Sequence, residues 1–310
     1  MNSGNLIIGL LFLSESTMGI LGNVSLPFNY LVFYQKKKKL KPMDLILMHL
    51  IMVNSLIILF KGLPNTVAAF GLKQFFNYWN YQFFLYVLRV FRSMSIVTTC
   101  LLSVFQAITI SPRNSCWKNL KVKSPRDIGL YISVCWVFYI MVNVIFPVYV
   151  SIKFNRKNKT KETEFEHHTS VGHDKVTVSS YITFFVFPEL LFSVLITWSS
   201  SSMIVNLYSH KQRVQYIYST HVSHRRSMES RATQSILALV STFLVFYTFS
   251  AILHGCTALL YSNNSWLVNI TAIITLCFPT LSPFILKSQD STVSRTCFIW
   301  IKGAKFPMSL

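Results

Sequence analysis

The sequence is poor in charged residues and especially in acidic ones. Of its 310 residues, 13% are charged and 52% are hydrophobic, and 10 Asp and Glu stand against 29 Lys and Arg. Soluble domains usually carry about 25% charged residues, so the composition argues against a soluble protein. The formal charge of +19 could indicate a nucleic-acid-binding protein. That interpretation fails because the basic residues lie between long apolar runs, where lipid headgroups and a cytoplasmic partner are better counter-charges.

Catalytic and cofactor signatures are also missing. The chain has no phosphate-binding glycine-rich loop, no HExxH and no GxSxG, so it indicates no enzyme and no cofactor. His210, His221 and His224 lack the spacing of metal ligands, and we expect no metal site. Four of the six cysteines lie in apolar runs, and Cys116 and Cys297 lie in connecting segments on the same side. We therefore expect no extracellular disulfide framework.

Seven long apolar stretches dominate what is present. Each has about 20 residues or more, enough to cross a hydrocarbon layer of about 30 Å at about 1.5 Å per residue. We predict an all-α membrane protein in which a seven-helix transmembrane bundle forms one domain over residues 1–310, with residues 288–310 as a short tail. The first stretch is too long for a cleaved signal peptide and is expected to be a signal anchor. The predicted spans are residues 6–34, 44–64, 82–110, 127–152, 180–208, 232–260 and 266–287.

Positive charge alternates between the two sides of this predicted bundle. Counted loop by loop, 19 of the Lys and Arg residues lie on one side and 8 on the other, with Lys61 and Lys73 among the 8. Basic residues mark cytoplasmic loops, so we predict that the N-terminus is outside and the C-terminus is cytoplasmic. The sequon at Asn158 lies in the longest predicted outside loop, which agrees with this orientation and predicts N-glycosylation there.

Three of the charged residues inside the predicted spans are candidates for a ligand site. Arg89 and Arg92 are three apart on one face of the third span. Intramembrane charges usually face the bundle interior, a cavity or a partner. The two arginines therefore either extend to the headgroups or line an outward-facing ligand pocket. Glu189 follows Pro188 in the fifth span at a depth within a few Å of Arg89, by the rise of about 1.5 Å per residue. We hypothesise an ion pair or a shared polar cavity between Arg89 and Glu189.

Uncharged polar residues and prolines also interrupt the apolar runs. Asn23, His49 and Asn54 lie within the first two spans, where interhelical hydrogen bonding is the expected role. The basic segment 208–231 is either a solvated, lipid-facing loop or a docking surface for a cytoplasmic partner. Prolines inside spans are expected to kink or locally open their helices. Among the prolines of the spans, we expect this of Pro147, Pro188, Pro279 and Pro283.

Seven spans with an outside N-terminus suggest a G-protein-coupled receptor, and local motifs make the likeness more specific. The chain resembles the vomeronasal type-1 receptors along nearly its whole length. The third span ends in TTCLLSVFQAITISP, a fifteen-residue match that is very improbable by chance. Asp-Arg-Tyr after the third span and Asn-Pro-x-x-Tyr in the seventh are absent, as expected for this family. The matching stretches are residues 19–23 (GILGN), 44–47 (DLIL), 98–112, 231–237 (RATQSIL) and 278–284 (FPTLSPF).

The resemblance implies a plasma-membrane pheromone receptor. Such receptors bind small odorant-like or steroid-like molecules from outside and activate a heterotrimeric G protein of the Gi/o type. Asn158 matches the family's glycosylation position, Arg89 and Arg92 match basic positions of the third span, and Glu189 matches an acidic position after the proline of the fifth. From position rather than motif, four basic residues of the second and third inside loops are expected to meet the G protein. They are Arg113, Lys118, Arg225 and Arg226.

The chain departs from the family pattern at the expected outer face. The family usually has a disulfide between the outer end of the third span and the second outside loop, yet segments 77–82 and 165–170 contain no cysteine. The usual His-Arg pair of the third span is changed to Leu88-Arg89. Two alternatives therefore stay open beside a working receptor. One is a degenerate copy that reaches the cell surface poorly, and the other is a channel or transporter, which would need a continuous polar path.

Overall fold

The protein is described by a computed structural model for residues 3–37, 42–71, 78–110, 125–161, 187–217, 224–259 and 265–289. Within these ranges all regular secondary structure is helical. Because α2, η1 and α3 follow one another without a break, the described chain forms seven helical rods, as the sequence predicts. The elements are α1 (Ser3–Lys37), α2 (Pro42–Ile57), η1 (Ile58–Gly62), α3 (Leu63–Ala69), α4 (Tyr78–Ile110), α5 (Pro125–Lys161), α7 (Phe187–Ile217), α8 (His224–Leu259) and α9 (Ser265–Gln289).

Most of these rods are long and apolar enough to cross a membrane. Within the described residues, six helical stretches meet that requirement, and α7 adds a shorter apolar stretch, Leu190–Asn206. The description of α7 begins at Phe187, inside the predicted span 180–208. The all-α transmembrane bundle is therefore confirmed. The six stretches are Leu6–Phe28, Pro42–Ala69, Phe83–Ile110, Arg126–Val144, Gln234–His254 and Trp266–Lys287.

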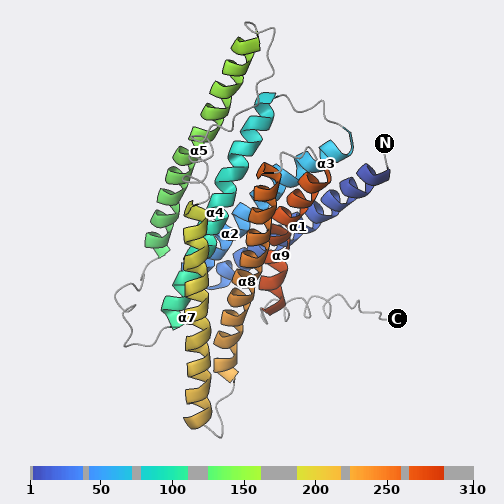
Figure 1. Ribbon diagram of the computed structural model, residues 1–310. Coiled ribbons are helices and arrows are strands. Elements are labelled where there is room, and N and C mark those ends of the chain that lie inside the picture. Colours follow the sequence, from blue (N-terminus) through green and yellow to red (C-terminus); the bar gives the residue numbers. More distant parts are fainter. Residues whose placement is uncertain are drawn as a thin grey trace, which may run out of the picture.

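Helix α4 is the central helix of the bundle. It packs against α2, η1, α5, α7 and α8, and 56% of its membrane-length window is buried, against 17% for α5. Figure 1 shows α5 alongside α4, α7 crossing the lower part of α4, and α8 and α9 between α7 and α1. A residue on the inward face of α4 can therefore contact several helices at once.

The second rod changes its helical register at η1. This segment, Ile58–Gly62, is π-helical, and α3 resumes with Pro64 in its first turn. Proline has no N–H, so Pro64 cannot donate the ordinary helical hydrogen bond to the carbonyl four residues earlier. Lys61 lies in η1, within the continuous stretch Pro42–Ala69, so counting it among the charges of the loop after the second span is wrong. Apolar residues on both sides of Lys61, including Phe60 and Leu63, belong to the same continuous helical stretch.

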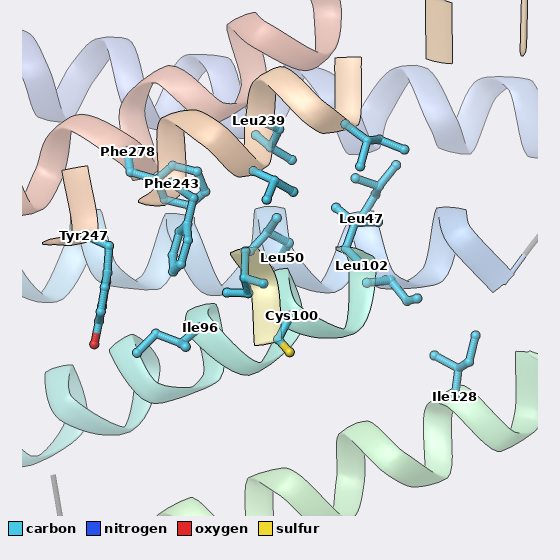
Figure 2. Close-up of a cluster of buried hydrophobic side chains, with 14 residues drawn as sticks. Leu47, Leu50, Ile96, Cys100, Leu102, Ile128, Leu239, Phe243, Tyr247 and Phe278 are labelled. Carbon is cyan, nitrogen blue, oxygen red and sulfur yellow. The ribbon is translucent and has the colours of Figure 1, made fainter. Parts of the chain in front are cut away.

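Two groups of buried apolar side chains form the core. The first is built on α2, α4, α8 and α9, and includes Leu50, Leu102, Leu239, Phe243 and Phe278; Figure 2 shows these side chains meeting between the helices. The second joins α1 to the rest through Phe12, Ile58, Met94 and Leu276. Apolar side chains on the outer faces of α5 and α7, such as Val134 and Trp198, remain exposed. An apolar exterior is expected where hydrocarbon is the solvent.

Buried amides join four helices within this apolar interior. Asn54 Nδ2 of α2 donates to Ser282 Oγ of α9 at 2.9 Å, and Ser95 Oγ of α4 donates to Asn54 Oδ1 at 3.2 Å. Asn23 of α1 donates to the carbonyl oxygen of Pro279 at 2.9 Å. All four polar side chains in these contacts are buried. The prediction of interhelical hydrogen bonding by Asn23 and Asn54 is confirmed.

His49 makes a third such connection, between α2, α4 and α5. Trp136 Nε1 donates to His49 Nε2 at 2.8 Å, and His49 Nδ1 lies 3.0 Å from Thr98 Oγ1. An indole N–H only donates, so Nε2 is an acceptor and the proton of the neutral ring lies on Nδ1. Thr98 in turn donates to the carbonyl of Met94 at 2.6 Å. The donations therefore run in one direction, from Trp136 through His49 to Thr98.

Candidate ligand site

Arg92 lies at the meeting of α4 with α8. Its Nη1 donates a hydrogen bond to Ser250 Oγ at 3.3 Å, and its guanidinium carbon lies 4.8 Å from the centre of the Tyr247 ring. A guanidinium over an aromatic face is attracted to the ring by typically about 0.5–2 kcal/mol. Two contacts of different kinds therefore fix the position of the Arg92 charge against α8.

Hydrogen bonds extend this contact to α9. Ser250 Oγ lies 2.9 Å from Thr275 Oγ1, and Thr275 Oγ1 donates to the carbonyl of Thr271 at 2.6 Å. A threonine hydroxyl has one hydrogen, so Ser250 must donate to Thr275 while it accepts from Arg92. One arginine of α4 is thus connected through Ser250 to both α8 and α9.

A histidine of α8 lies beside this contact, and two further basic side chains act on its ring. His254 lies one turn after Ser250 on α8, and its Nδ1 is 2.7 Å from the Ser250 carbonyl oxygen. A carbonyl only accepts, so Nδ1 carries a proton. Lys61, Arg89 and Arg92 each interact electrostatically with the His254 ring. We refer to Lys61, Arg89, Arg92 and His254 as the basic cluster.

An aromatic stack continues from the basic cluster into the core. Tyr247 stacks on Phe243 with ring centres 5.2 Å apart, and Phe243 packs edge-on against Phe278 of α9 at 4.8 Å. Figure 2 shows Tyr247 and Phe243 reaching from α8 toward α4, with Phe278 beside Phe243. Tyr247, Phe243 and Phe278 are 8%, 2% and 5% exposed, so the stack is a packed part of the core. A movement of the Arg92 side chain would therefore displace Tyr247, which is packed against side chains of the bundle interior.

The residues expected to form a ligand pocket are distributed over two packed helices. Arg89 and Arg92 lie on α4, both partly buried, and the structure brings both to the basic cluster. Glu189 lies in the first described turn of α7, which packs extensively against α4. The side chain of Glu189 lies outside the described part of the chain, so its pairing with Arg89 stays a hypothesis.

The other predicted site residues lie at or beyond the helix ends. Arg225 and Arg226 are in the first turn of α8, where only the backbone is described. Arg113 and Lys118 lie in 111–124, outside the described residues. Asn158 lies near the end of α5, whose helix runs to Lys161 rather than ending near the predicted boundary at 152. The roles of these five residues stay predictions.

Lys61 and His254 of the basic cluster are not singled out as site residues from the sequence, and neither are the polar contacts of Arg92. The count of loop charges assigns Lys61 to the outside loop, although the predicted span 44–64 contains it. His254 and Ser250 lie inside the predicted sixth span and are not singled out by the sequence pattern. An imidazole in a membrane span is a functional signal on general grounds. Only the packing of α8 on α4 shows that Ser250, 158 positions away in sequence, contacts Arg92.

The arrangement of the helices defines the class of protein. The structure is similar to the crystal structure of squid rhodopsin, with a TM-score of 0.69 over 99% of this chain and 89% of that one, at 14% sequence identity. At that identity the likeness establishes the fold alone, which is a seven-helix bundle. The helix lengths and the apolar exterior described above agree with it.

Sequence comparison identifies the family. Residues 6–299 match the model of the vomeronasal organ pheromone receptor family. Human vomeronasal type-1 receptor 4 is 46% identical over 94% of this chain and 96% of its own length. Human vomeronasal type-1 receptor 2 is also 46% identical, over 93% of this chain and 73% of its own length. Rat vomeronasal type-1 receptor 90 is 27% identical over 92% of this chain and 91% of its own.

The chain belongs to the vomeronasal organ pheromone receptor family, and the relatives named above are vomeronasal type-1 receptors. It is therefore a G-protein-coupled receptor and a multi-pass protein of the plasma membrane, and it is not an enzyme. The resemblance inferred from its sequence motifs is confirmed.

Proposed function

We propose that this receptor binds small odorant-like or steroid-like pheromones from outside the cell and activates a G protein of the Gi/o type. The observation that carries this proposal is the contact of Arg92 with Tyr247 and Ser250, which joins α4 to α8 and, through Thr275, to α9. A ligand that touches this point acts on three helices at once. With the N-terminus outside, as the loop charges predict, the basic cluster lies in the outer part of the bundle.

Differential affinity for two helix arrangements would produce the signal. A ligand shifts a conformational equilibrium only by as much as it prefers one state over the other. The Arg92–Tyr247 contact has two possible states, formed and broken, and a ligand group near Arg92 favours one of them. Tyr247 stacks on Phe243, and Phe243 packs against Phe278, so movement of Tyr247 requires repacking between α8 and α9. That repacking opens the cytoplasmic ends of the helices.

The cytoplasmic ends are where the G protein would dock. Arg225 and Arg226 begin α8, the helix that also carries Tyr247 and Ser250. Arg113 and Lys118 follow the end of α4 in sequence. Basic residues at these two helix ends offer charge complementarity to an acidic partner surface, which raises association rates. The helices α4 and α8 would therefore connect the ligand contact directly to the coupling surface.

A signalling assay tests this function. Cells that display the full chain would be exposed to a panel of volatile odorants and steroid-like compounds, with forskolin-raised cyclic AMP as the readout. We expect at least one compound to lower cyclic AMP, and a toxin that ADP-ribosylates Gi/o proteins to abolish the effect. The paired change Arg225→Gln and Arg226→Gln should weaken the response at equal surface display, while the control Lys287→Gln should not.

Three outcomes would overturn the proposal. If the receptor is abundant at the surface and no compound lowers cyclic AMP, the pheromone function fails for this panel and this coupling. If the response persists with the toxin present, the Gi/o assignment is wrong. If the chain is held inside the cell in every cell type tested, including vomeronasal neurons, the degenerate copy is the better account.

A further inference from the structure

Ser250 of α8 directs its hydroxyl hydrogen out of its own helix. Buried serines elsewhere in the described chain, such as Ser103 and Ser200, donate to the carbonyl four residues earlier in the same helix, at 3.0 and 2.7 Å. Serine and threonine side chains inside helices commonly make this bond. The Ser250 hydroxyl instead lies 2.9 Å from Thr275 Oγ1 of α9, and Ser250 is 2% exposed. The direction of this buried hydroxyl is therefore decided by another helix.

Thr275 determines that direction. Its own hydrogen is used in the 2.6 Å bond to the carbonyl oxygen of Thr271, so toward Ser250 it can only accept. Ser250 consequently donates its one hydrogen to Thr275 and presents oxygen lone pairs to α4. Arg92 Nη1 donates to that oxygen at 3.3 Å. The oxygen that Arg92 binds is thus oriented by a hydroxyl of α9.

The contact between Arg92 and Tyr247 depends on this orientation. The guanidinium carbon lies 4.8 Å from the centre of the Tyr247 ring. The ring is held by its own packing, because it stacks on Phe243 with ring centres 5.2 Å apart and ring planes 15° apart (Figure 2). An arginine side chain has many rotamers and loses much conformational freedom when it is ordered. A hydrogen bond that holds the guanidinium therefore favours formation of the ring contact.

Loss of the Thr275 hydroxyl would release Ser250 from α9. The usual acceptor for a helical serine, the carbonyl four residues earlier in its own helix, would then compete for the Ser250 hydrogen, as it does at Ser103 and Ser200. Turning to that carbonyl requires a different side-chain rotamer. The rotation moves the oxygen to which Arg92 donates, so the Arg92 guanidinium would be held less often over the Tyr247 ring.

We infer that Thr275 is a positioning residue of this receptor. Through Ser250 it holds Arg92 on the Tyr247 ring, and so sets from α9 the fraction of receptor molecules in which the Arg92–Tyr247 contact is formed. The inference rests on the proposed function in one respect, which is that formation and loss of this contact govern signalling. It adds a residue of α9 that acts on the contact without touching a ligand, and it predicts that removing the Thr275 acceptor favours the broken contact.

A fluorine label on Tyr247 tests the positioning role without a ligand or a G protein. The full-length receptor is purified in lipid nanodiscs with a fluorotyrosine in place of Tyr247, and its fluorine NMR spectrum reports whether the guanidinium lies over the ring. Arg92→Gln supplies the spectrum of the broken contact. One hydrogen bond changes such an equilibrium by about two- to tenfold, so Thr275→Val should lower the ratio of formed to broken contact by about that factor.

Matched variants separate positioning from packing. Thr275→Ser keeps the acceptor and the donor to Thr271, and should give the wild-type spectrum. Thr271→Val removes a buried hydroxyl of the same helix, which donates to the carbonyl of Leu267 at 2.7 Å; it leaves the Thr271 carbonyl in place and should not change the ratio. In a Ser250→Ala receptor, Thr275→Val should have no further effect on the contact, because the connection to Arg92 is already lost. The Tm of each variant shows whether it has folded, and Thr275→Ala replaces Thr275→Val if that variant has not.

The remaining outcomes contradict the inference. A wild-type spectrum from folded Thr275→Val, an equal spectral change in Thr271→Val, or an undiminished effect of Thr275→Val in the Ser250→Ala receptor would each overturn it. Signalling is measured separately, in cells at equal surface display. Thr275→Val should lower forskolin-raised cyclic AMP without any ligand, and Thr275→Ser should not. A changed spectrum with unchanged signalling would contradict the proposed function and leave the positioning role standing.

Discussion

Asn23 of α1 supplies a hydrogen bond in place of one that the backbone of α9 cannot make. Its Nδ2 donates to the carbonyl oxygen of Pro279 at 2.9 Å. In a regular helix the residue four positions later would donate to that carbonyl, but the residue there is Pro283, which has no N–H. Ser282 Oγ donates to the same oxygen at 3.2 Å. An interrupted helix is tolerated in hydrocarbon only when neighbouring groups satisfy the freed backbone in this way.

Removing the Asn23 amide should therefore destabilise the bundle. Asn23→Leu leaves the Pro279 carbonyl with the longer Ser282 contact alone, and the loss of one hydrogen bond costs about 0.5–1.5 kcal/mol. We expect a lower Tm for the purified receptor and less protein at the cell surface. Ser14→Ala is the matched control, because the Ser14 hydroxyl is exposed and bonds only to the carbonyl of Leu11 in its own helix. An Asn23→Leu receptor as stable as the control would contradict this role.

Trp136 and His49 allow a similar test between α2 and α5. Trp136→Phe keeps an aromatic ring but removes the donor to His49 Nε2, leaving that nitrogen without its 2.8 Å partner. A lost hydrogen bond of this kind is worth about 0.5–1.5 kcal/mol, so Tm should fall measurably. Trp198→Phe is the control, since Trp198 is 68% exposed on the outside of α7. Equal Tm values for the two variants would show that the His49 contact contributes no net stability.

The close approach of α1 to η1 depends on Gly62. A Cβ at this position would collide with Ser16 Oγ, so Gly62→Ala should destabilise the receptor. Adding Ser16→Ala removes the colliding atom and should recover part of the loss, as coupled neighbouring sites do. Gly129→Ala is the control, because nothing lies within 4 Å of a Cβ there. The measurement is the Tm of the four proteins, and a loss of stability that Ser16→Ala does not reduce would argue against this packing.

Glu189 provides a test of the hypothesis that α7 contributes to the ligand site. If Glu189 shares a polar cavity with Arg89, Glu189→Gln should reduce the response to an activating compound while surface display stays near that of the wild type. The glutamine keeps the size of the side chain and removes its charge. A concentration–response curve on cells matched for surface level measures the effect. An unchanged curve together with normal display would remove Glu189 from the site.

The sequence allows the helices and some of their contacts to be predicted. A membrane span is a local property of about 20 consecutive residues, so all seven can be found, and Asn23, His49 and Asn54 are recognisable as polar residues that need partners inside the bundle. Their partners cannot be named from the sequence. Pro279 is 256 positions from Asn23, and only packing shows that α1 lies against α9.

The candidate site is predicted less completely, for a reason that Lys61 illustrates. Span prediction from hydropathy includes Lys61 in residues 44–64, whereas the count of loop charges assigns it to the next loop. They do not detect a π-helical turn, which changes the direction of a side chain without changing composition. Arg92 is singled out because an intramembrane arginine is rare. Ser250 and Tyr247, which hold it, are ordinary residues of a helix, and their importance follows only from the 3.3 Å and 4.8 Å contacts.

Orientation underlies the whole account, because the basic cluster can receive ligands from outside only if the N-terminus is extracellular. The most direct measurement is labelling of an N-terminal epitope on intact cells, with a C-terminal epitope as the inside control. The account predicts N-terminal labelling of unpermeabilised cells and C-terminal labelling only after permeabilisation. The reverse pattern would contradict it, because the cluster would then lie at the cytoplasmic side and could not receive an external pheromone.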